Sequence, residues 1–98
     1  MLDTLMERIN KKVDGQDAFG FTVKLDLGET GKIMIDGNAT PIGVSESDGP
    51  ADTTFVMDAG DLAAMLDGDL PPMNAYMQGK LRVEGDMGKA MQFGSVFS

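Results

Sequence analysis

Hydrophobic and polar residues alternate most regularly over residues 19–27, where every odd position is phenylalanine, valine or leucine. Glycine or polar residues stand between them, and this period of two predicts a long strand with one buried face. A turn over 28–31 leads to a second predicted strand over 33–35, which is apolar on both faces. Residues 42–44 predict a third strand, and Pro41 places it at a sheet edge, because proline cannot donate to a central ladder.

Apolar residues recur at helical spacing in two further segments. Residues 2–13 predict an amphipathic helix that covers something apolar. After a fourth predicted strand over 53–57, residues 59–67 predict a second helix. Asp58 is placed to cap the start of this helix with its side chain, and Gly68 is placed to stop it.

The stretch Leu70–Gly88 joins three short elements. Two prolines open a helical turn over 71–78, and the alternation over 80–85 predicts a half-buried fifth strand. Asp86 then caps a last helix. The first and fifth strands are apolar on one face only, so the sheet should have one wet face with the helices gathered on the other. The sequence therefore predicts one two-layer α+β domain over residues 1–98.

Charge and composition exclude several classes of protein. The chain carries a formal net charge of −8, and its eight basic residues are scattered. Nucleic-acid binding needs clustered Lys and Arg, and an anionic membrane would on average repel the chain. The longest fully apolar run, 62–66, has five residues, which is too short for membrane insertion. We expect no nucleic-acid partner and a cytoplasmic location.

Catalytic and metal-binding patterns are absent from the sequence. It contains no cysteine and no histidine, which excludes Ser-His and Cys-His nucleophiles and thiolate metal sites. The aspartates do not follow the spacing of a calcium-binding loop. Gly85–Gly88 matches the GxxG pattern that grips nucleic-acid backbones, but its aspartate would repel phosphate, so we interpret it as a strand-to-helix turn. We expect no enzyme activity, no metal and no cofactor.

Nine methionines are the most suggestive feature of the composition. Met73 and Met77 are four residues apart, as are Met87 and Met91, so each pair shares a helix face. These side chains are either ordinary core or the adaptable lining of an apolar ligand cavity. Gln78 also has two interpretations: an exposed residue at a helix end, or a hydrogen-bonding partner for the polar end of an apolar ligand.

Several segments together carry a family resemblance. They are Ala51-Asp52-Thr53-Thr54, Asp61-Leu62, Leu66-x-Gly68, Ala75–Leu81 and Gly85-Asp86-Met87-Gly88-x-Ala90-Met91. From Phe19 to Phe97 the chain resembles the sterol carrier protein 2 family of small lipid-binding domains. The resemblance implies a five-stranded, mostly antiparallel sheet with helices on one face and an apolar tunnel between them. It also implies binding of a fatty acid, fatty acyl-CoA, sterol or similar lipid, without catalysis.

The resemblance also implies which residues form the tunnel. Carried over by position, the wall would contain Phe19, Phe21, Met34, Phe55, Met65, Met73, Met77, Leu81 and Met91. Gln78 matches a glutamine that lies near the ligand in the family. The acidic charge of this chain disfavours acyl-CoA, because the CoA phosphates would meet few cations.

Two functions are compatible with these observations. The first is a soluble, non-enzymatic lipid carrier that does not insert stably into membranes. The second is an interaction module, in which the apolar helix face docks to an enzyme of lipid metabolism. A large exposed apolar patch without an enclosed cavity would favour the second.

Overall fold

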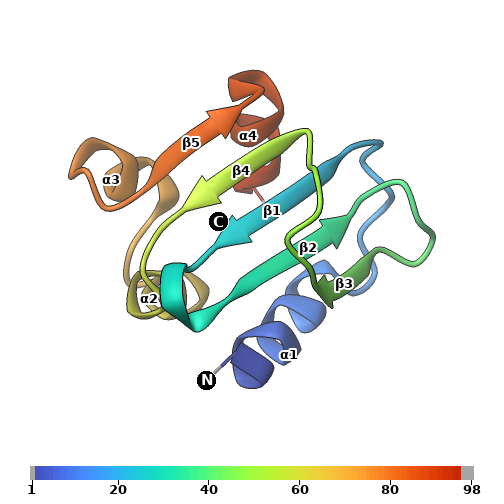
Figure 1. The fold of residues 1–98 in the computed structure, drawn as a ribbon, viewed down its shortest axis with the longest axis horizontal. Coiled ribbons are helices and arrows are strands. Elements are labelled where there is room, and N and C mark those ends of the chain that lie inside the picture. The colour runs from blue at the N-terminus through green and yellow to red at the C-terminus, as the bar shows by residue number, and fades with distance from the viewer. Residues whose placement is uncertain (1, 96–98) are drawn as a thin grey trace.

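The computed structural model of the chain describes residues 2–95, and its elements follow the predicted order (Figure 1). Within those residues the helices are α1 (Leu2–Val13), α2 (Ala59–Asp67), α3 (Pro72–Met77) and α4 (Met87–Gly94), with a 3-10 turn, η1, at Gly28–Thr30. The strands are β1 (Thr22–Asp26), β2 (Lys32–Asp36), β3 (Gly43–Glu46), β4 (Thr53–Val56) and β5 (Arg82–Gly85). β1 is shorter than predicted, although buried and less buried side chains still alternate from residue 21 to residue 27.

The strands form one sheet in the order β3-β2-β1-β4-β5. β1 and β4 are parallel neighbours, and the other neighbouring pairs are antiparallel. The predicted α+β class and the mostly antiparallel sheet are therefore confirmed. β3 lies at an edge, as Pro41 indicated, and β1 lies at the centre.

One face of the sheet carries the core. Ile33, Leu25 and Phe55 form a row across β2, β1 and β4, and each is at most 2% exposed. α1, α2 and α4 lie behind the sheet in the view of Figure 1, and α3 lies at the periphery, next to the start of β5. Three helices thus cover the apolar face, whereas α3 stands beside it.

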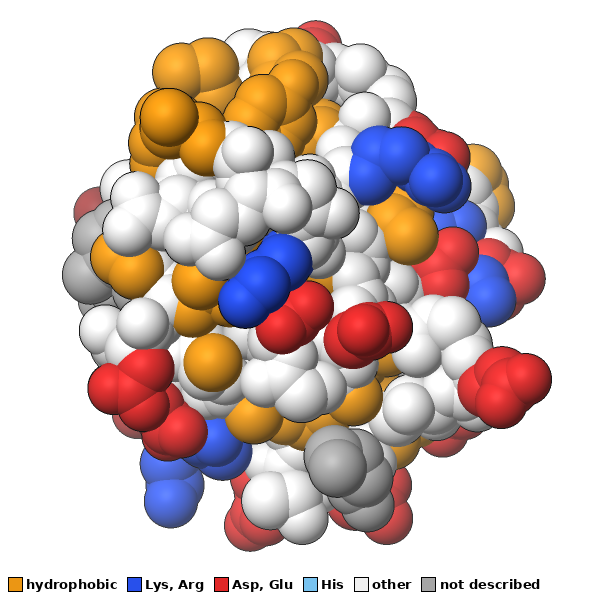
Figure 2. Space-filling model, turned by 90° about the vertical axis from the view of Figure 1, so that its left-hand side faces the viewer, with side chains coloured by type: hydrophobic (Ala, Val, Ile, Leu, Met, Phe, Trp, Pro, Cys, Tyr) orange, Lys and Arg blue, Asp and Glu red, His pale blue; other side chains and the backbone are white. Residues whose placement is uncertain are grey.

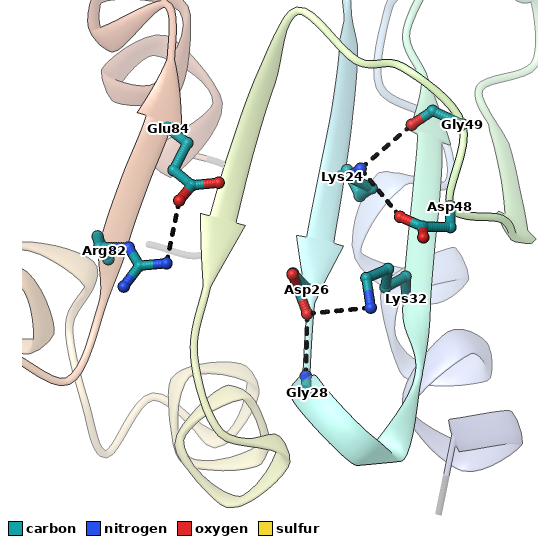
Figure 3. A network of polar contacts seen from close by, with 8 residues as sticks. All are labelled: Lys24, Asp26, Gly28, Lys32, Asp48, Gly49, Arg82 and Glu84. Carbon is teal, nitrogen blue, oxygen red and sulfur yellow. Dashed lines mark hydrogen bonds and ion pairs between the residues drawn. The ribbon is translucent and has the colours of Figure 1, made fainter.

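The opposite face of the sheet is polar, as predicted (Figure 3). The Lys24 ammonium nitrogen lies 3.1 Å from an Asp48 carboxylate oxygen and 3.2 Å from the Gly49 carbonyl oxygen. These two contacts tie the connection between β3 and β4 to the central strand. Asp26 and Lys32 form a further ion pair, at 3.6 Å, between β1 and β2.

The predicted helix ends are confirmed with one correction. The Asp86 carboxylate accepts a hydrogen bond from the Lys89 amide at 3.0 Å and so caps α4. Gly68 ends α2 in the left-handed conformation, with φ +83°. Asp58 stands at the N-cap position of α2, as predicted, but within the described residues its side chain makes no capping hydrogen bond. The Asp58 carbonyl instead accepts the Leu62 amide at 3.0 Å.

Asp52 links three elements near the start of β4. Its carboxylate accepts hydrogen bonds from the Thr22 amide at 2.9 Å and the Thr22 hydroxyl at 3.3 Å. The bond from the Thr22 amide is the main reason that the pKa of Asp52 is lowered. The Asp52 carbonyl accepts the Asp86 amide at 3.1 Å, and a Cβ added to Gly85 would lie only 2.7 Å from the same oxygen. Gly85–Gly88 is thus a strand-to-helix turn, as predicted.

Candidate functional site

One group of the predicted tunnel-wall residues belongs to the core. Phe21, Phe55, Met65 and Leu81 are at most 6% exposed, and Phe19 is partly buried against the same core. Met65 of α2 is thus packed in the core, and its contact with a ligand stays a prediction. These residues form the apolar floor of the candidate site.

Phe93 of α4 joins this floor, although it was not among the predicted wall residues. Its ring centroid lies 5.5 Å from that of Phe19 and 5.8 Å from that of Phe55, and the rings of Phe19 and Phe21 are 4.6 Å apart. Such separations and tilted geometries are favourable for aromatic pairs. The helical spacing of Phe93 from the buried Ala90 is the sequence signal that could have identified it.

A second group of predicted wall residues is exposed to solvent. Met73, Met77 and Met91 are 58%, 77% and 64% exposed, and Tyr76 and Met87 add 47% and 43%. We refer to these five residues of α3 and α4 as the α3–α4 surface. Figure 2, which looks at the molecule from the side of α3, shows hydrophobic side chains gathered at the upper left of this face. For these methionines the interpretation as ordinary core is wrong.

The short length of α3 explains why its methionines are exposed. The helix has six residues, begins after Pro71 and is followed by Gln78 and then Gly79 at φ +76°. Ala75 is its buried residue. Met73 and Met77 share a helix face, as their spacing predicted, but that face points to solvent.

Gln78 lies at the C-terminal end of α3 and is exposed. Its backbone amide donates to the Asn74 backbone carbonyl at 2.9 Å, which continues the hydrogen bonding of the helix. The interpretation of Gln78 as an exposed residue at a helix end is confirmed. Contact between its side chain and a ligand stays a prediction.

The structure does not bring Met34 together with the other predicted residues. Met34 pairs with Lys24 of β1 and Ser45 of β3, so it lies on the polar face of the sheet. Its neighbours Ile33 and Ile35 point into the core instead. Because side chains alternate along a strand, the sequence already contained this information. Met34 is therefore left out of the candidate site.

Two hollows on the described surface are open to solvent. One, of about 140 Å³, is lined by Gln16, Asp17, Phe19, Phe21, Gln92, Phe93 and Ser95. The other, of about 420 Å³, is lined by Gly28, Val56, Met57, Asp58, Asp61, Gly79, Lys80 and Arg82. The first is smaller than the roughly 300–1,000 Å³ of most ligand pockets, and the second is lined by four charged side chains. Neither is the enclosed apolar tunnel that the family resemblance implied.

Two negative findings apply to the part of the chain that the structure describes. Among residues 2–95, no three or more acidic side chains are grouped so that they could hold a metal ion. Over the same residues, no helix has the length and apolar character needed to cross a membrane.

The fold and the site define a small α+β domain with one helix-covered sheet face and exposed methionines on two short helices. Residues 2–98 match the model of the SCP-2 sterol transfer family, and the chain belongs to this family. The predicted family is therefore confirmed. Sterol carrier protein 2 of Rattus norvegicus is 36% identical over 92 residues, which make up 92% of this chain but 16% of that relative. The chain thus corresponds to a small part of the rat protein.

Two solved structures from Aedes aegypti show the same fold. The crystal structure of Sterol Carrier Protein 2 Like 2 has a TM-score of 0.81 and 22% identity, and the match covers 97% of this chain and 94% of that one. The solution structure of Sterol Carrier Protein-2 in complex with the C16 fatty acid palmitate has a TM-score of 0.78 and 21% identity, with coverages of 98% and 93%.

Proposed function

We propose that this chain is a non-enzymatic lipid carrier, active as one domain over residues 1–98 in the cytoplasm. Its cargo would be a fatty acid, a sterol or another largely apolar lipid, held between the helices and the sheet. The observation that carries the proposal is the α3–α4 surface, which exposes four methionines and a tyrosine. The family and the palmitate complex of the Aedes aegypti relative support the same ligand class.

The structure suggests how a lipid would enter. α3 buries Ala75, while its larger side chains face solvent, so moving α3 away from the core would break few packed contacts. Leu81 precedes β5 and donates its backbone amide to the Ala75 carbonyl of α3 at 3.2 Å. Leu81 and Phe55 of β4 are buried, and we expect both to contact an acyl chain once α3 has moved. Met73 and Met77 would close over it, because unbranched thioether side chains conform to irregular ligands.

The energetics favour binding of moderate strength. Burial of ten methylene groups is worth roughly 8 kcal/mol, at about 0.8 kcal/mol each. Association and ordering costs of several kcal/mol offset part of this gain. We therefore expect dissociation constants in the micromolar range or weaker.

Native mass spectrometry of protein purified from cells, followed by organic extraction, tests the proposal directly. We expect a co-purifying lipid, and saturable binding of a fluorescent fatty acid that unlabelled fatty acid competes away. The proposal is abandoned if no lipid co-purifies and the fluorescent acid shows no saturable, competable binding.

A matched pair of substitutions tests the location of the site. Met77→Ser changes the most exposed methionine of the α3–α4 surface, and Met34→Ser makes the same change on the polar face of the sheet. We expect Met77→Ser to weaken fatty-acid binding about tenfold, since one contacting methionine contributes on the order of 1.5 kcal/mol. Met34→Ser should change it less than twofold. Equal effects would place the ligand elsewhere.

The exposed apolar surface also favours the second candidate function, an interaction module that docks to an enzyme of lipid metabolism. The two candidates differ in what lipid does to the surface. A carrier should shield the α3–α4 surface when it is loaded, and so should lose binding of a hydrophobic dye on addition of fatty acid. An interaction module should bind the dye equally well with and without fatty acid.

A further inference from the structure

The large hydrophobic side chains that the domain exposes share a chemical property. Among residues 2–95 they are four methionines and a tyrosine, the five residues of the α3–α4 surface. Every leucine, isoleucine and phenylalanine of the same residues is buried or half-buried. Because leucine would offer a similar apolar area, the thioether sulfur is what distinguishes the exposed positions.

Methionines elsewhere in the described chain are less accessible. Met57 and Met65 are 5% and 1% exposed, and Met6 and Met34 are half-buried. All four methionines of α3 and α4 are at least 43% exposed. The sequence contains no cysteine, so no thiolate competes with these sulfur atoms for an oxidant.

We propose that the four methionines of the α3–α4 surface form an oxidative modification site, at which a peroxide makes this surface polar and so weakens lipid binding. The effect on binding rests on the proposed lipid-carrier function. A sulfur lone pair attacks one oxygen of hydrogen peroxide, so that an S–O bond forms and the O–O bond breaks. The proton of the transferred oxygen passes to the leaving hydroxide, which departs as water. The thioether is thereby oxidised to the sulfoxide and the peroxide is reduced.

Access of the oxidant makes the reaction selective. Peroxide reaches the sulfur of Met77 without any movement of the protein, because this residue is 77% exposed. It reaches Met65 only when the core opens, and core helices open more rarely than peripheral ones. We therefore expect sulfoxide to form at Met77 at least about tenfold faster than at Met65.

The position of the sulfoxides decides what they change. On an exposed face the added oxygen is hydrated and breaks no core contact, so the fold should remain intact. When Met73 and Met77 close over an acyl chain, however, the sulfoxide oxygens lose water and gain no hydrogen-bond donor from the lipid. We expect the dissociation constant of a fatty acid to rise about tenfold after oxidation.

A time course with hydrogen peroxide on lipid-free protein tests the site. Proteolysis and tandem mass spectrometry measure the sulfoxide at each methionine, and we expect it first on α3 and α4. Equal rates at Met77 and Met65, or faster reaction at Met6 or Met34, would overturn the proposal. The melting temperature should fall by no more than about 2–4 °C over the same period. A larger fall would show that oxidation acts by unfolding the domain, and would also overturn it.

Two leucine variants connect the site to binding. One variant replaces all four methionines of the α3–α4 surface by leucine, and the control combines Met6→Leu with Met34→Leu. For each protein the dissociation constant of a fluorescent fatty acid is measured before and after peroxide. We expect a ratio of about ten for the native chain and the control, and below about two for the first variant. Equal ratios in the two variants would contradict the proposal.

Repair of the sulfoxides supplies a further readout. The two methionine sulfoxide reductases, one for each epimer, should return both the mass and the affinity of the oxidised protein to their starting values. The oxygen then leaves as water while a dithiol reductant is oxidised to its disulfide. A restored mass without restored affinity would assign the loss to other damage, such as damage at Tyr76, and the proposal would fail.

Titration of the unoxidised protein with the fluorescent acid separates this inference from the proposed function. If the acid binds saturably and the sulfoxides do not weaken its binding, the modification site has no effect on the cargo and the carrier function stands. If the acid does not bind the unoxidised protein, the carrier function fails and the inferred effect of oxidation fails with it.

Discussion

α2 and α3 are consecutive helices that the sequence describes in similar terms, yet they differ in how they meet the core. Both contain alanine and methionine at helical spacing. α2 buries Ala59, Leu62, Met65 and Leu66, whereas α3 buries Ala75. α2 lies behind the sheet, and α3 lies at its periphery (Figure 1). The contrast shows that one apolar pattern serves as core in the first helix and as exposed surface in the second.

The largest expected effect comes from the same substitution in the two helices. Met65→Ala should lower the free energy of unfolding by about 2–5 kcal/mol, because Met65 is 1% exposed and its removal leaves a cavity. Met77→Ala should change it by less than about 0.5 kcal/mol, because Met77 is 77% exposed. Urea unfolding measures both. Similar losses would mean that α3 is packed as firmly as α2.

A smaller effect is expected at the glycines that follow the two helices. Gly68 and Gly79 have φ +83° and +76°, and among the described residues no atom lies within 4 Å of a Cβ added to either. Alanine at either position should therefore act through backbone strain alone, of about 1–2 kcal/mol. We expect Gly68→Ala to show this loss in full and Gly79→Ala less than half of it, since α3 can open locally. Equal losses in urea would show that α3 unfolds only with the whole domain.

The dependence of stability on acidic pH extends the comparison to α4. The Asp52 backbone carbonyl accepts a hydrogen bond from the Asp86 backbone amide, which lies directly before α4. The pKa of Asp52 is lowered in the folded protein, mainly by the hydrogen bond from the Thr22 amide. A lowered pKa contributes stability that is present above the ordinary value of 3.8 and is lost as the pH falls through the folded pKa. At neutral pH the melting temperature of the native chain should exceed that of the Asp52→Asn variant. The difference between the two melting temperatures should shrink when the pH falls below 3.8. A difference independent of pH would contradict this.

The smallest effect on stability is expected at the end of α3. Gln78→Leu replaces an exposed side chain and should shift the melting temperature by no more than about 2–4 °C. If Gln78 contacts the polar end of the ligand, the preference for a fatty acid over its methyl ester should fall about threefold or more, the worth of one hydrogen bond. Competition against a fluorescent fatty acid measures this ratio. A large loss of stability with unchanged preference would show that Gln78 only ends the helix.

Much of the candidate site could be predicted from sequence, and the exceptions have physical reasons. The paired methionines were expected to share helix faces, and they do, but helical spacing does not say whether a face meets the core. Met34 was predicted to line the tunnel because of the family resemblance. The alternation of side chains along its own strand places it on the polar face of the sheet instead. Phe93 was expected on the apolar side of the last helix but not in the tunnel wall, because its contacts with Phe19 and Phe55 join parts of the chain far apart in sequence.

The sequence by itself determined the order of the elements, the one-sided first strand, the Asp86 cap, the Gly68 stop and the family. These depend on interactions over a few residues, such as strand alternation and capping, which any part of the chain expresses locally. Only the tertiary structure decided which methionines are core and which are surface, because burial depends on what the sheet and the other helices leave uncovered. It also decided that Met73 and Met77 face solvent, which follows from the peripheral position of α3 beside β5.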